Sequence, residues 1–235
     1  MLASLIPALM GGCPPPEPTD GIDLSVRGEL FLKISRPLGR ASADVTAHVI
    51  DREAGFLIFQ VLELSRTQVL GVDGTALEHR FLDLPGWVSA TVMVLAPPNA
   101  HSITFSNDGE IRDMLVTAVN ETSITAPSAG ETVSSSGFTL LWSPSAEPGV
   151  LVTVSIEGDV PDPERPGSTM RSIETLSDRP DSGTLSIGSQ ELAKYLPGTI
   201  EVKLARHRTA NQALGFRGGV VIVEASDRRA FSLGT

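Results

Sequence analysis

The chain is poor in cysteine, histidine and basic residues, and each shortage excludes a class of protein. Its one cysteine, Cys13, cannot form a disulfide within the chain, and its four histidines lie far apart, which argues against a zinc site. Only 18 basic residues stand against 28 acidic ones, for a net charge of −10, whereas nucleic-acid binding needs a basic face. No apolar run reaches the length of about 20 residues that a membrane-spanning helix requires. We therefore expect no zinc centre, no nucleic-acid partner and no transmembrane helix.

The chain does contain enough apolar material for folded cores, divided by many turns. Hydrophobic residues make up 41% of the 235 residues and charged residues 20%, as is typical of globular domains. The 22 glycines and 17 prolines favour short elements joined by turns. The length fits one large domain or two of about 100 residues each.

Apolar and polar residues alternate along much of the chain, which predicts strands with one buried face. The alternation is clearest at 41–49, 138–142, 150–156 and 200–204. Turn dipeptides separate such runs: Asp73-Gly74, Asp108-Gly109, Pro148-Gly149, Pro197-Gly198 and Gly218-Gly219. The pattern predicts an all-β protein made of antiparallel β-sandwiches.

A natural boundary at 119–127 divides the chain into two parts of similar length. We expect an N-terminal β-sandwich at 22–119 and a C-terminal one at 122–235, each of a size that suits seven strands. One helical turn is expected at 189–195, with Ser189 as its N-cap.

Three segments of the C-terminal half carry a family pattern, at 136–144, 150–156 and 196–205. They resemble the second, third and sixth strands of a fibronectin type III domain, and the resemblance implies that Trp142 is the core tryptophan between two sheets. Because Glu201 stands where that family has its tyrosine-corner residue, the expectation is the broader immunoglobulin-like sandwich. This architecture hosts many unrelated functions, so it does not identify a ligand.

In the N-terminal half, residues 61–77, 88–94 and 101–105 are similar to the first domains of bacterial envelope lipoproteins with tandem Ig-like domains. The resemblance implies a sandwich in this half as well. The turn at Asp73-Gly74 lies between apolar flanks and is explained as a hairpin.

The N-terminus carries a short apolar segment without charged side chains, directly before Cys13. The run Leu9-Met-Gly-Gly-Cys13 resembles a bacterial lipobox, which implies that 1–12 is a signal peptide and that the cysteine carries lipid. Residues 13–21 then form the lipidated cysteine and a proline-rich tether. The implied location is the bacterial envelope, with the outer membrane favoured because Pro14, not aspartate, follows the cysteine. The alternative is that the apolar N-terminal segment is not a signal peptide and that the cysteine follows it by chance.

Motifs for catalysis or cofactor binding are missing from the sequence. It has no G-x-S-x-G, no phosphate-binding glycine loop and no closely spaced histidine pair, so we expect no enzyme and no cofactor. A proline-rich loop holds Asp159, Asp162 and Glu164, which are weak candidates for calcium. Because the dense D-x-D-x-D-G spacing is absent and Arg165 supplies a competing cation, no metal site is expected there.

These features favour a lipid-anchored, non-enzymatic envelope lipoprotein whose β-sandwich domains bind an envelope protein or a polysaccharide. Two alternatives stand beside this one. The chain could be an accessory module that assists a separate exported hydrolase, or a cryptic hydrolase with its site in the cleft between the domains.

Overall fold

The computed structural model describes residues 17–19, 23–51, 60–78, 87–93, 100–211 and 214–234. Within these ranges nearly all regular structure is β-strand, and sheets pack face to face, so the predicted all-β sandwich fold is confirmed. The predicted signal segment 1–12, Cys13 and His79 lie outside the described residues.

The first half of the chain supplies β1 (Glu17–Pro18), α1 (Leu24–Arg27), β2 (Gly28–Pro37), β3 (Ser42–Asp51), β4 (Gln60–Glu63), β5 (Gln68–Val72), β6 (Thr75–Ala76), β7 (Trp87–Met93), β8 (Ala100–Asn107) and β9 (Glu110–Thr117). The second half supplies β10 (Ile124–Ala126), β11 (Thr132–Ser134), β12 (Gly137–Trp142), β13 (Leu151–Pro161), β14 (Thr169–Pro180), β15 (Thr184–Gly188), α2 (Ser189–Leu192), β16 (Gly198–Asn211) and β17 (Gly218–Gly234). The predicted turns Asp73-Gly74 and Asp108-Gly109 close the β5–β6 and β8–β9 hairpins. All four of these residues have positive φ, as a type I′ turn requires.

Two local predictions are wrong. Gly218-Gly219 is not a turn but the start of β17, because both glycines pair with residues 29–30 of β2. The N-cap of α2 is Gly188 rather than Ser189. Gly188 has no side chain that could accept from the first turn, and the Glu191 carboxylate accepts a hydrogen bond from the Gly188 N–H at 3.0 Å, as the third helical residue does in a capping box.

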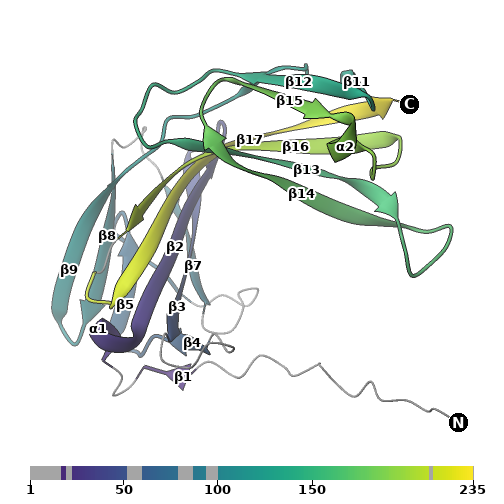
Figure 1. The fold of residues 1–235 in the computed structure, drawn as a ribbon. Coiled ribbons are helices and arrows are strands. Elements are labelled where there is room, and N and C mark those ends of the chain that lie inside the picture. Colours follow the sequence, from purple (N-terminus) through teal and green to yellow (C-terminus); the bar gives the residue numbers. More distant parts are fainter. Residues whose placement is uncertain are drawn as a thin grey trace, which may run out of the picture.

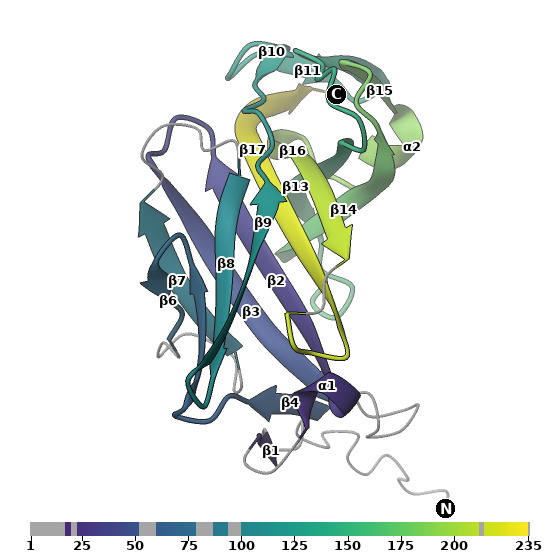
Figure 2. The ribbon, with the colours of Figure 1, turned by 90° about the vertical axis from the view of Figure 1, so that its left-hand side faces the viewer.

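One large sheet runs through the whole molecule, in the strand order β1-β4-β3-β2-β17-β16-β13-β14 (Figure 1). Two small sheets pack on it, β6-β5-β8-β9 in the first half and β10-β12-β15 in the second. Figure 2 shows the first small sheet in front of β2 and β3, and the strands of the second above it. The two halves are joined through β17, which pairs in parallel with β2 over 218–226 and antiparallel with β16 along almost its whole length.

Each small sheet encloses an apolar core against the large sheet. The first core includes Leu30, Leu32, Ile34, Val45, Val49, Ile103, Phe105, Val221, Val223 and Ala225. The second includes Leu140, Trp142, Val152, Val154, Ile156, Ile187, Val202, Leu204, Phe231 and Leu233. All the β17 side chains in these two sets have odd numbers, so both cores lie on the same face of that strand.

The expected division of the chain needs correction at two places, Val150 and residues 214–226, both of which were assigned to the C-terminal sandwich although side chains from them pack in the first core. Within residues 214–226, these side chains include Leu214, Phe216 and Val221. The change from one core to the other falls within β17 itself. Strand pairing across the junction therefore makes the two sandwiches share their central strand.

Trp142 lies where the alternation on its strand predicts. Its side chain is 4% exposed and packs in the second core with Leu140, and Phe138 packs against the same core, so this prediction is confirmed. The indole Nε1 donates a hydrogen bond of 2.6 Å to Asp181. A polar partner at this position satisfies the one N–H that burial would otherwise leave without water.

Candidate functional site: the open face of the large sheet

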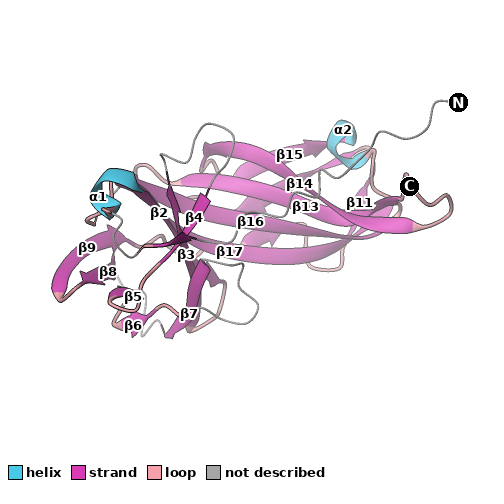
Figure 3. Cartoon of the chain, turned by 90° about the horizontal axis from the view of Figure 1, so that it is seen from below, coloured by secondary structure: helices cyan, strands magenta, loops and turns pink. Residues whose placement is uncertain are grey.

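The face of the large sheet that points away from both cores is called the open face here. It is formed by β3, β2, β17, β16, β13 and β14. Figure 1 shows that the large sheet bends between its halves and that both small sheets lie on the outer side of the bend, so the open face lines the inner side. Figure 3, seen from below, shows the corresponding side of β13, β14, β16 and β17 turned toward the viewer.

The first half of the open face contains an apolar hollow of about 210 Å³. Its lining residues are Phe31, Leu32, Lys33, Thr46, His48, Val220 and Ile222. Phe31 and His48 are direct neighbours on β2 and β3, and their rings stack with centroids 5.2 Å apart. His48 falls on the polar phase of the alternation at 41–49, which by itself predicts a solvated ring. In the structure the ring is half-buried, and burial lowers the pKa of this histidine. A neutral imidazole therefore contributes to an apolar surface at neutral pH.

A buried carboxylate lies on the part of β17 that pairs with both β2 and β16, between the lysines that border the two hollows. Glu224 lies 2.7 Å from the Nζ atoms of both Lys33 and Lys203, and it accepts a hydrogen bond of 3.0 Å from Ser35. Burial acts to raise the pKa of this carboxyl, but the hydrogen bonds and charges of the two lysines outweigh it and lower the pKa to about 2. The ion cluster thus ties β2, β17 and β16 together.

Acid should destabilise the protein through Glu224. The ordinary pKa is 4.5 and the folded-state value is about 2, so the stabilisation is complete above the ordinary pKa and is lost as pH falls toward the folded value. The difference corresponds to about 3 kcal/mol. Urea unfolding at about pH 6 and about pH 3 should show a smaller loss of stability for Glu224→Gln than for wild type. Equal losses in the two proteins would contradict this linkage.

The second half of the open face contains a smaller hollow of about 160 Å³, lined by Ser155, Glu157, Ile173, Glu201, Lys203 and Arg228. Its charges neutralise one another, since Arg228 pairs with Glu201 and lies 3.6 Å from Glu157. The Ile173 side chain is 64% exposed beside these pairs. The hollow therefore offers an apolar group bordered by balanced charges.

A cluster of His207, Thr153 and Asp178 from β16, β13 and β14 was not predicted from the sequence. The Nε2 atom of His207 lies 3.0 Å from the Thr153 hydroxyl and 3.2 Å from the Asp178 carboxylate, and Thr153 also donates to Asp178. The hydrogen bond from Thr153, together with the charge of His207, lowers the pKa of Asp178. A hydroxyl–histidine–acid relay needs the acid on Nδ1 and the hydroxyl on Nε2. Here both partners meet one nitrogen, so the cluster lacks the relay geometry.

The three calcium candidates lie on the β13–β14 hairpin. Asp159 is 3.4 Å from Arg171, and the Asp162 side chain accepts a hydrogen bond of 2.9 Å from the Glu164 N–H, which is a local turn contact. Within the part of the chain that the structure describes, no group of three or more acidic, histidine or cysteine side chains could hold a metal ion. The hairpin does not bring Asp159, Asp162 and Glu164 together as ligands.

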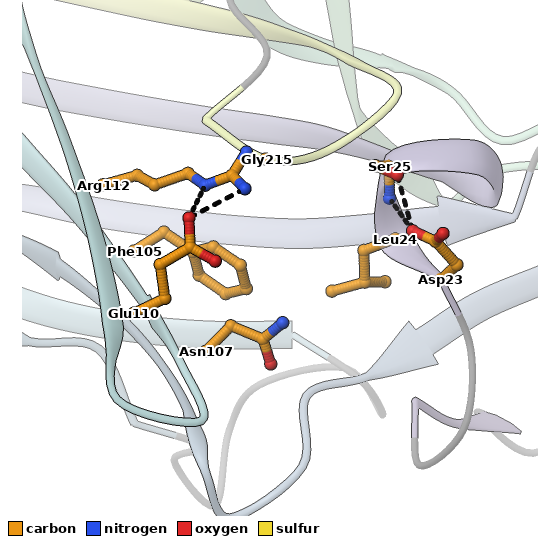
Figure 4. Close-up of a pocket in the computed structure, with 8 residues that line it drawn as sticks. All are labelled: Asp23, Leu24, Ser25, Phe105, Asn107, Glu110, Arg112 and Gly215. Carbon is orange, nitrogen blue, oxygen red and sulfur yellow. Dashed lines mark hydrogen bonds and ion pairs between the residues drawn. The ribbon is translucent and has the colours of Figure 1, made fainter.

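A polar hollow of about 260 Å³ lies at the far end of the first sandwich (Figure 4). Its lining residues are Asp23, Leu24, Ser25, Phe105, Asn107, Glu110, Arg112 and Gly215. Both Nε and Nη2 of Arg112 lie 3.0 Å from Glu110. Asp23 accepts hydrogen bonds from the hydroxyl and the N–H of Ser25 at the start of α1, which lower its pKa. The charged groups of this hollow are thus used in local pairing and in capping a helix.

The junction between the two sandwiches holds a buried ion pair next to a crevice of about 490 Å³. Arg206 is 2% exposed, and its Nε donates to Asp181 at 2.7 Å. The rest of its guanidinium donates to the carbonyl oxygens of Asn120, Glu121 and Ser143. These bonds connect the segment between the sandwiches and the β12–β13 loop to β16. The Arg206–Asp181 pair therefore has a structural role in stabilising the junction.

Comparison with known proteins adds little to this description. No protein-family model and no curated protein matches the chain. Among solved structures, the chain is similar to Escherichia coli alpha-2-macroglobulin in its native conformation, with 13% identity and a TM-score of 0.23, over 86% of this chain and 14% of that one. A likeness of this size carries no argument about function. Across the described residues no helix is long and apolar enough to cross a membrane.

Proposed function

We propose that the chain is a lipid-anchored, non-enzymatic envelope protein that binds a protein partner on the open face. The observation that carries the proposal is the apolar hollow around Phe31, Val220 and Ile222, on a sheet face that neither small sheet covers. Its immediate border holds Lys33 and Thr46. An apolar centre with a polar rim is the usual anatomy of a protein–protein interface.

The size of the hollow favours a protein partner over a small ligand. At about 210 Å³ it is smaller than the roughly 300–1,000 Å³ of typical small-molecule sites, and it suits one protruding apolar side chain. The second hollow lies on the same face beyond the Glu224 cluster, so a partner that crosses the bend would meet both. Paired charges between the hollows give that partner a defined set of polar contacts with little net charge.

Anchoring is proposed from the sequence around Cys13. An apolar run and two glycines precede this cysteine, and a proline-rich segment follows it. Because a single acyl chain binds membranes only marginally, stable anchoring needs more than one chain on the cysteine. The structure corrects the predicted tether 13–21 at its C-terminal end, because Glu17 and Pro18 pair in parallel with Leu62 and Glu63 of β4, and Thr19 is 1% exposed. A spacer between the lipid and the fold would therefore lie before Glu17.

Partner binding can be tested by site-specific photocrosslinking in the organism that carries the gene. A photoreactive residue at Ile222, in the first hollow, should form a discrete protein adduct, and the adduct should weaken when Phe31→Ala is added. The control is the same residue at Leu115, which is 71% exposed on β9. If the adduct is removed only by a glycosidase, the partner is a polysaccharide and the proposed protein partner is wrong. Equal crosslinking from both positions would contradict a site on the open face.

Anchoring can be tested separately by membrane fractionation of the full-length protein. Wild type should sediment with membranes and yield an N-terminal peptide that starts at a lipid-modified Cys13. The Cys13→Ser variant should move to the soluble periplasmic fraction. A wild-type protein that is found in the soluble fraction with Met1 still attached would overturn the lipid anchor and leave the crosslinking test unaffected.

A further inference from the structure

The large sheet ends at β14, a long strand with one side that no other described strand pairs with. Figure 1 shows β14 along the border of the second sandwich. Unpaired strand edges can accept a further strand, and natural proteins usually protect them with charged residues, prolines or bulges. Whether the edge of β14 is protected or can accept a further strand depends on the backbone groups and side chains on its unpaired side.

The hydrogen-bond pattern of the β13–β14 hairpin begins at its loop. The Asp162 N–H donates to the Ser168 carbonyl oxygen at 3.0 Å, so these two residues form a hydrogen-bonded pair. Because such pairs alternate along an antiparallel ladder, Met170, Ser172 and Glu174 also direct their backbone groups toward β13.

The intervening residues of β14 direct their backbone groups outward. Asp159, which lies opposite Arg171, confirms the alternation, because its carbonyl oxygen accepts from the Leu196 N–H on the other side of β13 at 2.8 Å. The N–H and C=O groups of Arg171, Ile173 and Thr175 therefore point to the free edge. These groups form a ready template for an antiparallel strand.

Apolar side chains accompany this template. Ile173 is 64% exposed on the open face. Met170 lies on the opposite face, the one on which Val160 and Leu176 pack against the second core, and it is still 46% exposed. Exposed apolar residues on a long edge favour pairing rather than protection against it.

We propose that β14 pairs antiparallel with β14 of a second copy of this chain, about a two-fold axis perpendicular to the sheet at Ile173. In this register Ile173 faces its own counterpart, Met170 faces Leu176, and Arg171 faces Thr175. Apolar residues thus meet apolar residues, and no two like charges stand opposite each other. The large sheet becomes continuous through both copies.

Neighbouring registers are less favourable for reasons of charge and hydropathy. Centring the axis on Glu174 would place two carboxylates directly opposite, and centring it on Arg171 would do the same with two guanidinium groups. Centring it on Ser172 would set Ile173 against Arg171. The register at Ile173 avoids all three pairings.

The expected dimer is weak and reversible. Pairing along one strand buries less surface than the roughly 1,200–2,000 Å² of stable interfaces. The net charge of −10 on each copy also opposes association until salt screens it. The two-fold axis would turn both open faces to the same side, so the dimer would present two copies of the proposed binding surface, although the pairing does not depend on that function.

The test is sedimentation equilibrium of the full-length chain carrying Cys13→Ser, which prevents both lipidation and disulfide-linked dimers. The mass should rise from monomer to dimer with protein concentration at physiological salt. Ile173→Pro removes an N–H that faces outward and leaves the β13 ladder intact, so it should weaken the dimer by more than about tenfold. Ile173→Lys should have a similar effect. Ile111→Lys, at a residue 70% exposed on β9, should leave the dimer unchanged.

Circular dichroism and melting temperature establish whether each variant is folded. If Ile173→Pro does not fold, Ile173→Lys alone decides the outcome. A wild-type chain that stays monomeric up to about millimolar concentration would overturn the proposal. A dimer that survives both substitutions at Ile173, or one that Ile111→Lys weakens equally, would overturn it as well.

Discussion

Residues 22–119 expressed alone are expected to show no cooperative thermal unfolding and no dispersed amide NMR spectrum. This fragment contains β2 but lacks β17, its parallel neighbour in the centre of the large sheet. It also lacks the side chains that residues 214–226 supply to the first core: Leu214, Phe216, Val221, Val223 and Ala225. Each large buried side chain contributes about 1.5–3 kcal/mol, so together they approach the whole stability of a domain, about 5–15 kcal/mol.

A matched control is the same fragment with residues 212–228 appended through a glycine–serine linker. It restores the pairing between β2 and β17 without the second core, so it should recover much of the missing order. The full-length chain should unfold in a single transition, because both cores depend on the same strand. A fragment 22–119 that melts cooperatively near the full-length temperature would show that β17 is dispensable to the first sandwich.

Trp142→Ala should lower the free energy of unfolding by about 3–5 kcal/mol, because it empties the centre of the second core. The indole is 4% exposed, and its Nε1 is one of several donors to the buried Asp181 carboxylate. Arg206 and the Ser145 N–H supply others. Truncation therefore creates a cavity and also removes one hydrogen bond from the Asp181 carboxylate.

Trp142→Phe is the control that separates these two effects, since it keeps an aromatic ring but loses the N–H. It should lower the free energy of unfolding by about 1–3 kcal/mol, as expected for the loss of one hydrogen bond to a buried charged group. Urea unfolding of the two variants and wild type gives both values. If Trp142→Ala left the unfolding midpoint unchanged, the indole could not fill the core in the way the structure shows.

Much of the local structure could be predicted from the sequence. The alternation at 138–142 and 200–204 fell on β12 and β16 with the expected faces buried, because burial of one sheet face imposes a two-residue period. The Asp73-Gly74 and Asp108-Gly109 turns were confirmed because their backbone needs positive φ. The Gly218-Gly219 prediction was wrong because glycine also occurs in strands.

The candidate site could not be predicted in the same way. Lys33, Lys203 and Glu224 come from three strands, and two of the three lie about 190 residues apart along the chain. Asp178 on β14 contacts His207 on β16, although the two residues are 29 positions apart in the sequence. Local patterns carry no signal for such contacts, since they depend on which strands become neighbours.

The sequence by itself determined the all-β class, the positions of many strands and tight turns, and the burial of Trp142. These follow from short-range rules of period, turn geometry and hydrophobic burial, which act within a few residues. Only the tertiary structure decided that β17 crosses from one core to the other beside β2, that the large sheet bends, and that its open face carries two hollows with the Glu224 cluster between them. The physical reason is that parallel pairing between distant segments is selected by the packing of the whole chain, not by any residue pattern within one strand.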